Sequence, residues 1–324
     1  MIRGLNMAEI TVVGSINMDI VALTNKYPEH GETLFGDSVK LLCGGKGANQ
    51  AITCARLGKS VNMVGSIGMD TYGKVIEKNF QENQIDTNYL KRVENESTGC
   101  AIITVDAAAE NTMLVVKGAN DSLNVQDIQA AFSRIEESKI LLIQMEIPEA
   151  AVLSAMTEAK NKGMFIILDP APAEGVTKQA LRYADLITPN LQETKQLTGI
   201  DVISIETAIE AGEYFNQHLG VKNSVIKMAE KGALLYENGK STFVEAIPVK
   251  AVDTVGAGDS YAGALACAIA DGENLESAVK YAAIVAAIKV SNLGAQTVPT
   301  IEQVNKYCEE NNLSYYGLQT KQIR

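Results

Sequence analysis

Short apolar runs that alternate with amphipathic helical patterns constrain the fold of this chain more than any other feature. Runs rich in β-branched residues occur at 10–13, 61–64, 140–143, 165–168, 186–187 and 225–226. Helical patterns lie between them, at 49–57, 72–82, 125–135, 150–162 and 208–219. Strands that alternate with helices form βαβ units, so the sequence predicts an α/β fold with a doubly wound, mostly parallel sheet in a three-layer α/β/α arrangement. The final third predicts long helices near 260–270, 275–290 and 301–310.

Two segments, 17–43 and 97–118, break this alternation. Both contain short runs of alternating apolar residues without a helix between them, a pattern that predicts strands. Because both segments leave the large domain near the same edge, we expect a small β-sheet lid over the ligand site. Lids of this kind exclude water from reacting groups. Exposed strand edges commonly pair with another copy, so a homodimer joined through the lid is also expected. The chain then forms one catalytic domain over 8–312 and a C-terminal tail at 313–324.

Composition excludes several classes of protein and partner. The chain has 28 Lys and Arg against 39 Asp and Glu and no basic cluster, which argues against nucleic acid and anionic membranes as partners. It lacks the ~18-residue apolar run of a membrane span and shows no signal-peptide run near its start. The 5 cysteines are scattered without a C-x-x-C pair, which is typical of reduced thiols in a cytoplasmic protein. With 2 histidines and no H-E-x-x-H spacing, neither a zinc site nor a Ser-His-Asp triad is expected.

The segment 253–259, Asp-Thr-Val-Gly-Ala-Gly-Asp, predicts a site for an anion. The turn Gly256-Ala257-Gly258 is nearly free of side chains and runs into an apolar helical stretch, where backbone N–H groups and the helix dipole attract negative charge. Asp259 sets a carboxylate at the edge of this turn. An anion hole beside a general base is what phosphoryl transfer to an alcohol requires. Taken alone, the segment fits an ordinary Gly-rich turn with an Asp N-cap equally well.

Polar residues follow several of the predicted strands, at Asn17, Asp19, Glu146, Asn190 and Lys227. Ligands of a doubly wound sheet bind at the carboxyl ends of its strands, which is where these residues fall. Asn17 and Asp19 are two apart on an extended segment, so they share a face and can hold two adjacent sugar hydroxyls. An Asx turn that ends the strand is the alternative for this pair.

Two further motifs remain ambiguous on their own. In Gly-Gly-Lys-Gly-Ala-Asn-Gln at 44–50, Lys46 and Asn49 can donate to sugar hydroxyls, although a Gly pair before a helix is often only a turn. Asn190 and Glu193 could form a helix cap with its capping-box glutamate, or they could orient a hydrated magnesium ion. No complete P-loop or G-x-G-x-x-G is present, which disfavours a Walker-type NTPase and a dinucleotide dehydrogenase.

Together these blocks resemble the ribokinase family of ATP-dependent sugar kinases, from residue 10 to about residue 299. The matching blocks, in the order of the family, are N-x-D at 17–19, Gly-Gly-Lys-Gly-Ala-Asn at 44–49, the lid strands, Gln-Met-Glu at 144–146, Asp-Pro-Ala-Pro-Ala at 169–173, Thr-Pro-Asn-x-x-Glu at 188–193, Asp-Thr-x-Gly-Ala-Gly-Asp at 253–259 and Gly-Ala-Gln at 294–296. The resemblance implies that Asp259 takes the proton from the 5-hydroxyl of the sugar as that oxygen attacks the γ-phosphorus of ATP. It also implies that the amides of Gly256, Ala257 and Gly258 hold the charge of the transferring group.

The resemblance further implies three sets of binding residues. The ribose-contacting set is Asn17, Asp19, Gly45, Lys46, Asn49 and Glu146. The nucleotide set is Asn190, Glu193, Lys227, Ala229 and Gly232, with Mg²⁺ on the side of the first two. A K⁺ site beside the anion hole would use the Asp253 side chain, the carbonyls of Val255, Lys289, Asn292 and Gly294, and the hydroxyl of Thr297. This ion would fix the turn that carries the anion hole.

The segment 227–232 departs from the T-x-G-x-x-G that many relatives have there. Ala229 replaces a glycine and narrows the space for nucleotide, whereas Lys227 adds a positive charge within reach of phosphate. The leading expectation remains ATP-dependent phosphorylation of D-ribose at its 5-hydroxyl. The alternatives are a related kinase for deoxyribose, another small sugar or a nucleoside, and a non-catalytic sugar sensor. The low aromatic content of 5% favours a sugar over a nucleoside, and the intact Asp259 argues against the sensor.

Overall fold

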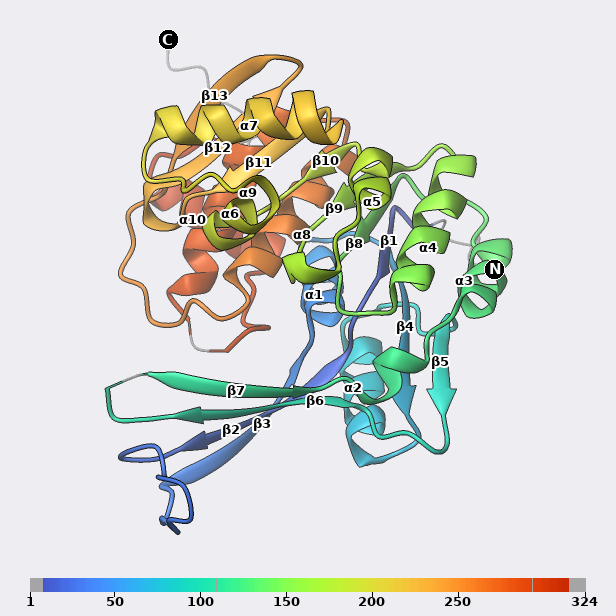
Figure 1. The fold of residues 1–324 in the computed structure, drawn as a ribbon, viewed down its shortest axis with the longest axis vertical. Helices are drawn as coiled ribbons and strands as arrows, with labels where there is room; N and C mark the ends of the chain where they lie inside the picture. The colour runs from blue at the N-terminus through green and yellow to red at the C-terminus, as the bar shows by residue number, and fades with distance from the viewer. Residues whose placement is uncertain (1–7, 109, 293, 315–324) are drawn as a thin grey trace.

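The computed structural model describes residues 8–108, 110–292 and 294–314, and a nine-stranded sheet organises this part of the chain. Its strand order is β13-β12-β11-β10-β9-β8-β1-β4-β5 (Figure 1). The strands are β1 (Ile10–Val13), β4 (Val61–Gly68), β5 (Leu90–Val93), β8 (Ile140–Ile143), β9 (Phe165–Leu168), β10 (Leu186–Ile187), β11 (Asn223–Lys227), β12 (Gly232–Glu237) and β13 (Lys240–Glu245). All neighbouring pairs from β5 to β11 are parallel, and β12 and β13 add an antiparallel edge. The predicted mostly parallel sheet is therefore confirmed.

Helices cover both faces of this sheet. They are α1 (Lys46–Arg56), α2 (Thr71–Glu82), α3 (Val125–Arg134), α4 (Glu149–Asn161), α5 (Lys178–Tyr183), α6 (Leu191–Thr198), α7 (Ile205–Leu219), α8 (Ala257–Ala270), α9 (Leu275–Val290) and α10 (Ile301–Glu310). Side chains of β8 alternate between two buried clusters, with Leu142 facing α1, α8 and α9 and Leu141 facing α3, α4 and α7. This alternation is the geometry of a strand buried on both faces, and it confirms the three layers. No helix in the described ranges is long and apolar enough to cross a membrane.

The β12–β13 hairpin is the main element that the sequence analysis missed. Asn238 and Gly239 join the two strands with positive φ values of 49° and 83°. Asn-Gly is the preferred pair for a two-residue hairpin turn, because both positions then adopt left-handed conformations. The signal for this hairpin was therefore present in the sequence. The helices at 275–290 and 301–310 begin and end where they were predicted.

A separate four-stranded sheet projects beyond the carboxyl end of β1 and lies below the large sheet in Figure 1. Its strands are β2 (Asn17–Leu23), β3 (Ser38–Gly44), β6 (Gly99–Val105) and β7 (Asn111–Val116), in the order β3-β2-β6-β7. They come from the two segments that broke the helical alternation, so the predicted small sheet is confirmed. Residues opposite one another across a sheet share a face. Asp19 is thus aligned with Leu42, Ala101 and Val115 on one face of this sheet.

Candidate active site

The N-terminus of α8 carries the predicted anion-binding turn. Gly256 precedes the helix with φ 76°, and no side chain caps the helix start. This left-handed conformation favours glycine, and a Cβ on Gly256 would also lie 2.8 Å from the Ala295 carbonyl. The Lys227 ammonium lies 3.3 Å from the point where a Cβ on Gly258 would stand. A helix N-terminus and an ammonium therefore meet at the same place, an arrangement suited to a phosphate group.

Asp259 lies in the first turn of α8 and is 8% exposed. Its Oδ2 accepts a hydrogen bond from Asn49 Nδ2 at 2.9 Å, and its Oδ1 accepts one from Gln50 Nε2 at 3.3 Å. These two donors reach it because α1 packs closely on α8 at Gly263, where a Cβ would lie 2.7 Å from Thr53. Burial raises the pKa of Asp259, and the Lys46 charge and the Asn49 hydrogen bond oppose that rise. A carboxylate with a raised pKa is a stronger general base.

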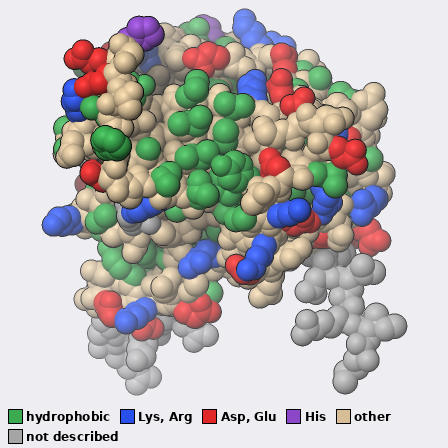
Figure 2. Space-filling model, turned by 90° about the horizontal axis from the view of Figure 1, so that it is seen from below, with side chains coloured by type: hydrophobic (Ala, Val, Ile, Leu, Met, Phe, Trp, Pro, Cys, Tyr) green, Lys and Arg blue, Asp and Glu red, His purple; other side chains and the backbone are tan. Residues whose placement is uncertain are grey.

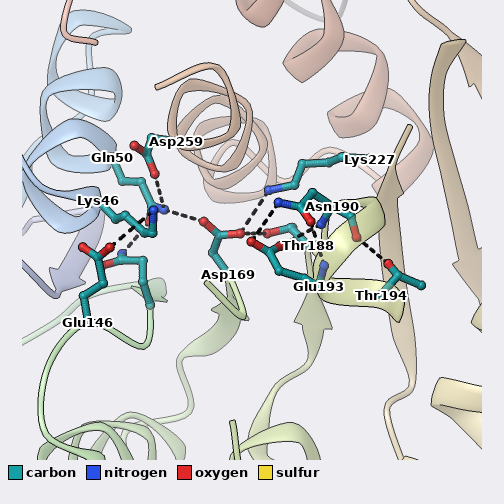
Figure 3. A network of polar contacts seen from close by, with 11 residues as sticks. Lys46, Gln50, Glu146, Asp169, Thr188, Asn190, Glu193, Thr194, Lys227 and Asp259 are labelled. Carbon is teal, nitrogen blue, oxygen red and sulfur yellow. Dashed lines mark hydrogen bonds and ion pairs between the residues drawn. The ribbon is translucent and has the colours of Figure 1, made fainter. Parts of the chain in front are cut away.

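Asp169 connects the two halves of the polar cluster. It follows β9, is 2% exposed, and accepts hydrogen bonds from Gln50 at 3.0 Å, Thr188 at 3.1 Å and Lys227 at 3.0 Å. Figure 3 shows Gln50 and Lys227 approaching this carboxylate from opposite sides. Asp169 and Gln50 are not among the site residues predicted from the sequence. The signal for Asp169 was its place at the carboxyl end of a predicted strand.

The predicted sugar residues gather beside Asp259. Lys46 Nζ lies 3.4 Å from Glu146 Oε1, whose second oxygen accepts a 2.6 Å hydrogen bond from the Ser15 hydroxyl. Burial disfavours the Lys46 ammonium, but the carboxylates of Glu146 and Asp259 raise its pKa overall. Gly45 is the residue before α1. The Lys46 side chain therefore stays charged among carboxylates at the edge of the cluster.

Asn17 and Asp19 reach the same place from β2. The Asn17 side-chain oxygen accepts a hydrogen bond of 2.8 Å from Asn120, which orients the amide. Burial raises the pKa of Asp19 to about 6, and the charges of Glu146 and Asp259 add to this rise. These mutual effects arise only between groups that lie close together. The structure thus brings the predicted base and the predicted sugar residues into one cluster.

On the nucleotide side, Asn190 and Glu193 form the N-terminal capping box of α6. Asn190 Oδ1 accepts from the Glu193 backbone N–H at 2.8 Å, and Glu193 Oε2 accepts from the Asn190 N–H at 2.8 Å. Of the two sequence interpretations, the helix cap is confirmed, and the magnesium role stays a prediction. Burial raises the pKa of Glu193, against the effect of the Lys227 ammonium. Figure 3 shows that this pair lies on the same side of Asp169 as Lys227.

The segment 227–232 forms a tight loop between β11 and β12. Ala229 has φ 51°, a conformation in which glycine is favoured, and its side chain is exposed. Met228 N–H donates to the Gly232 carbonyl at 2.8 Å and closes the loop. A cavity of about 460 Å³ opens beside it, lined in part by Met228 and Phe243. A larger cavity of about 630 Å³ lies elsewhere, beside Arg56, and none of the predicted site residues line it.

The residues predicted to bind K⁺ form a second cluster next to the turn before α8. Asp253 accepts from Val255 N–H at 2.9 Å and from Gly294 N–H at 2.8 Å, and the Thr297 hydroxyl donates to the Gly294 carbonyl at 2.6 Å. The Lys289 ammonium also enters this cluster, where it donates to the carbonyls of Asp253, at 2.9 Å, and Val255.

Two residues of this set make further contacts, and their role as K⁺ ligands stays a prediction. The predicted ligand from Lys289 is its carbonyl, and that carbonyl accepts from Asn292 N–H at 2.9 Å. The Asn292 side chain donates to the carbonyl of Ile288, within its own helix turn. Burial lowers the pKa of Lys289, while the Asp253 and Asp259 charges favour its ammonium form.

The fold and the comparisons with known proteins together identify a phosphotransferase that acts on a sugar hydroxyl. Residues 7–302 match the family model described as pfkB family carbohydrate kinase, and the chain belongs to this family. Among its relatives is the ribokinase of Haemophilus influenzae, which is 35% identical over 301 residues, covering 93% of this chain and 98% of the relative.

Two other comparisons bear on the substrate. The deoxyribokinase of Salmonella typhi is 36% identical over 307 residues and covers 94% of this chain and 99% of its own length. The solved structure of Arabidopsis thaliana ribokinase complexed with ribose and ATP superimposes with a TM-score of 0.84 at 31% identity, covering 92% of this chain and 98% of that one. Overall similarity therefore matches both a ribokinase and a deoxyribokinase, and the choice of sugar depends on the site.

Proposed function

We propose that this protein transfers the γ-phosphoryl group of ATP to the 5-hydroxyl of D-ribose, forming ribose 5-phosphate and ADP. The observation that carries this proposal is the buried Asp259 carboxylate, which lies at the anion-binding start of α8 and beside the sugar residues. The Arabidopsis relative, a ribokinase complexed with ribose and ATP, supports the same pair of substrates. A non-catalytic sugar sensor would not need a carboxylate at this point.

In this reaction Asp259 accepts the proton of the attacking hydroxyl. Asn49 and Gln50 each donate one hydrogen bond to its carboxylate, so they hold it in one orientation. The backbone amides of the turn 256–258 and the Lys227 ammonium stabilise the charge that develops on the transferring group. Such fixed donors are among the largest contributions to catalysis, because they require no reorganisation during the reaction.

The sugar is held by groups of complementary chemistry. The Asp19 carboxylate can accept hydrogen bonds from two adjacent hydroxyls, and Lys46 and Asn49 can donate to sugar oxygens. A site with several buried polar groups discriminates against a sugar that lacks one hydroxyl, because one of those groups then loses its partner. This reasoning favours ribose over deoxyribose. The deoxyribokinase relative makes deoxyribose the second candidate.

ATP enters as its Mg²⁺ complex in this proposal. Magnesium bound to a nucleotide keeps several waters and needs only one or two carboxylates from the protein. Glu193 and Asn190 would hold the ion on the nucleotide side through its waters, because both Glu193 oxygens already accept hydrogen bonds from Asn190. The ion would neutralise charge on the phosphates, while Asn190 and Glu193 would orient its water shell.

ADP release in a coupled assay tests this function. The protein is mixed with Mg-ATP and, in turn, D-ribose, deoxyribose, fructose, adenosine or no acceptor. Release that depends on ribose and exceeds that with every other acceptor is the expected result. Faster release with deoxyribose or another acceptor would keep the chemistry of Asp259 and reassign the sugar residues. No release from folded protein that binds ATP would contradict the proposal.

The affinity for ribose should fall as the pH is lowered through about 6, the value to which partial burial and the charges of Glu146 and Asp259 raise the pKa of Asp19. Its ionised carboxylate accepts hydrogen bonds from two hydroxyls, so the affinity for ribose is highest above this pKa. Below it the affinity falls by up to about tenfold per pH unit for a single protonation. Calorimetric titration with ribose on both sides of pH 6 measures this. Asp19→Asn should bind weakly throughout, without the inflection, and an inflection that persists in this variant would assign it to another group.

We also propose that the small sheet is a lid and that two copies dimerise through its outer face. The register of β2, β3, β6 and β7 puts large apolar side chains on the face opposite Asp19. The most exposed of them are Val39, Leu41, Ile102, Leu114 and Val116. Figure 2 views the molecule from below relative to Figure 1, which is the side on which this sheet projects. Hydrophobic side chains gather in the middle of this view. A row of exposed apolar residues on a sheet is a typical protein interface.

Leu114→Lys should dissociate this dimer. Leu114 is 64% exposed on the outer face, and burying an uncompensated charge there should raise the dissociation constant by roughly a hundredfold. Sedimentation velocity over a concentration series measures the change. Met113→Lys is the matched control, because Met113 is adjacent in β7, is 54% exposed and points to the opposite face. Equal effects of the two substitutions, or a monomeric unmodified protein, would contradict the interface.

A further inference from the structure

The side chain of Lys289 is the one feature of the second cluster that the proposed mechanism leaves unexplained. Lys289 lies in the last turn of α9 and is 0% exposed, although lysine is rarely buried in full. Its ammonium donates to the carbonyls of Asp253, at 2.9 Å, and Val255. Both carbonyls belong to the turn that leads into Gly256. A buried charge in this position needs a reason, since burial of a charge is costly unless it is compensated.

The residues around Lys289 do not fit an added K⁺. One of the groups predicted to bind the ion, the Val255 carbonyl, already accepts a hydrogen bond from the ammonium. The two oxygens of another, the Asp253 side chain, already accept from the backbone N–H groups of Val255 and Gly294. Two others bond to each other, since the Thr297 hydroxyl donates to the Gly294 carbonyl at 2.6 Å. A second cation among these groups would stand beside a like charge at close range, which is unfavourable in a site of low dielectric.

We propose that the Lys289 ammonium takes the place of a monovalent cation at this site, so that the enzyme needs no K⁺ for activity. This inference rests on the proposed function, in which the turn 256–258 holds the transferring group. An ammonium has the same charge as K⁺ and a similar size, and it satisfies carbonyl oxygens in the same way. Because it is covalently attached to α9, it cannot dissociate.

Lys289 would act as a positioning residue. Its contacts fix the backbone from Asp253 to Val255, which directly precedes Gly256 at the start of α8. Asp253 in turn bonds the Gly294 backbone at 2.8 Å, and Gly256 packs against Ala295. The ammonium therefore holds two loops together behind the predicted anion hole, without contact to either substrate.

Rates in two salts test this inference. Initial rates with Mg-ATP and ribose are compared in KCl and in choline chloride at equal ionic strength, and the unmodified protein should show the same rate in both. Lys289→Ala should lose roughly tenfold to a hundredfold in choline chloride, the scale of a displaced catalytic group, and KCl should restore much of this loss by filling the emptied carbonyl cluster. Lys289→Met fills the space with an uncharged chain, so its loss should persist in KCl.

Lys280→Ala is the matched control, because Lys280 lies on the same helix, is exposed and pairs with Glu276. This variant should match the unmodified protein in both salts. Activation of the unmodified protein by KCl would overturn the inference, because it would mean that an ion binds in addition to Lys289. Folded Lys289→Ala that responds to KCl no more than Lys289→Met would overturn it as well.

Thermal unfolding in the same two salts gives a readout that needs no turnover. The Tm of the unmodified protein should be the same in KCl and choline chloride, and the Tm of Lys289→Ala should be higher in KCl. If no sugar is phosphorylated at all, the proposed function fails while this comparison still decides whether Lys289 replaces a cation. A rise in the Tm of the unmodified protein that is specific to K⁺ would contradict the inference.

Discussion

Asp259→Asn should lower kcat by roughly a hundredfold or more, which is the scale of a lost general base. Asparagine has nearly the same shape, and its side-chain oxygen can still accept the hydrogen bond from Asn49 that the carboxylate accepts at 2.9 Å. It cannot take the proton of the attacking hydroxyl. Ribose and ATP should therefore bind with little change while turnover falls. Steady-state ADP release and calorimetric titration with ribose measure the two effects separately.

Asp271→Asn provides the matched control, because Asp271 is the C-cap residue at the opposite end of α8 and pairs with Lys59. It should leave kcat close to that of the unmodified protein. If Asp259→Asn retained near-normal kcat, the base would lie elsewhere. If it lost ribose affinity as strongly as turnover, Asp259 would serve to bind the sugar.

Asp169→Ala should have the largest effect on stability, a loss of about 3 kcal/mol in the free energy of unfolding. The substitution removes the acceptor of three hydrogen bonds, from Gln50, Thr188 and Lys227. Lys227, whose side chain is only 14% exposed, is then left without its carboxylate. Removing one partner of a buried ion pair is costly because the remaining charge stays desolvated. Urea unfolding followed by circular dichroism gives the change.

Asp201→Ala is the surface counterpart, because Asp201 pairs with Lys195 and both side chains are more than half exposed. Such a pair contributes less than about 1 kcal/mol. Adding Lys227→Met to Asp169→Ala should recover part of the stability, since the second substitution removes the unpaired ammonium. An Asp169→Ala variant that loses no more stability than Asp201→Ala would contradict this account of the buried pair.

Much of the fold could be predicted because its signals are local. A strand buried on both faces reads as an unbroken apolar run, as at Ile140–Ile143, and an amphipathic helix repeats its apolar residues at helical spacing, as at Ile301–Glu310. The Asn190 cap was also visible, because a capping box needs only residues three apart. The β12–β13 hairpin has a local signal as well, in Asn238-Gly239, although it is not among the elements predicted above.

The sequence alone determined the layers of the fold, the small sheet and the types of residue that the site would contain. Only the tertiary structure decided which side chains meet. Asp169 joins the two halves of the cluster because residues from three distant segments converge on it, and Gln50 lies 119 positions away in the chain. Lys289 reaches the Asp253 carbonyl across 36 positions because α9 ends beside the turn that precedes α8. Periodicity reports the conformation of neighbouring residues, whereas the direction of a buried side chain depends on packing between distant elements.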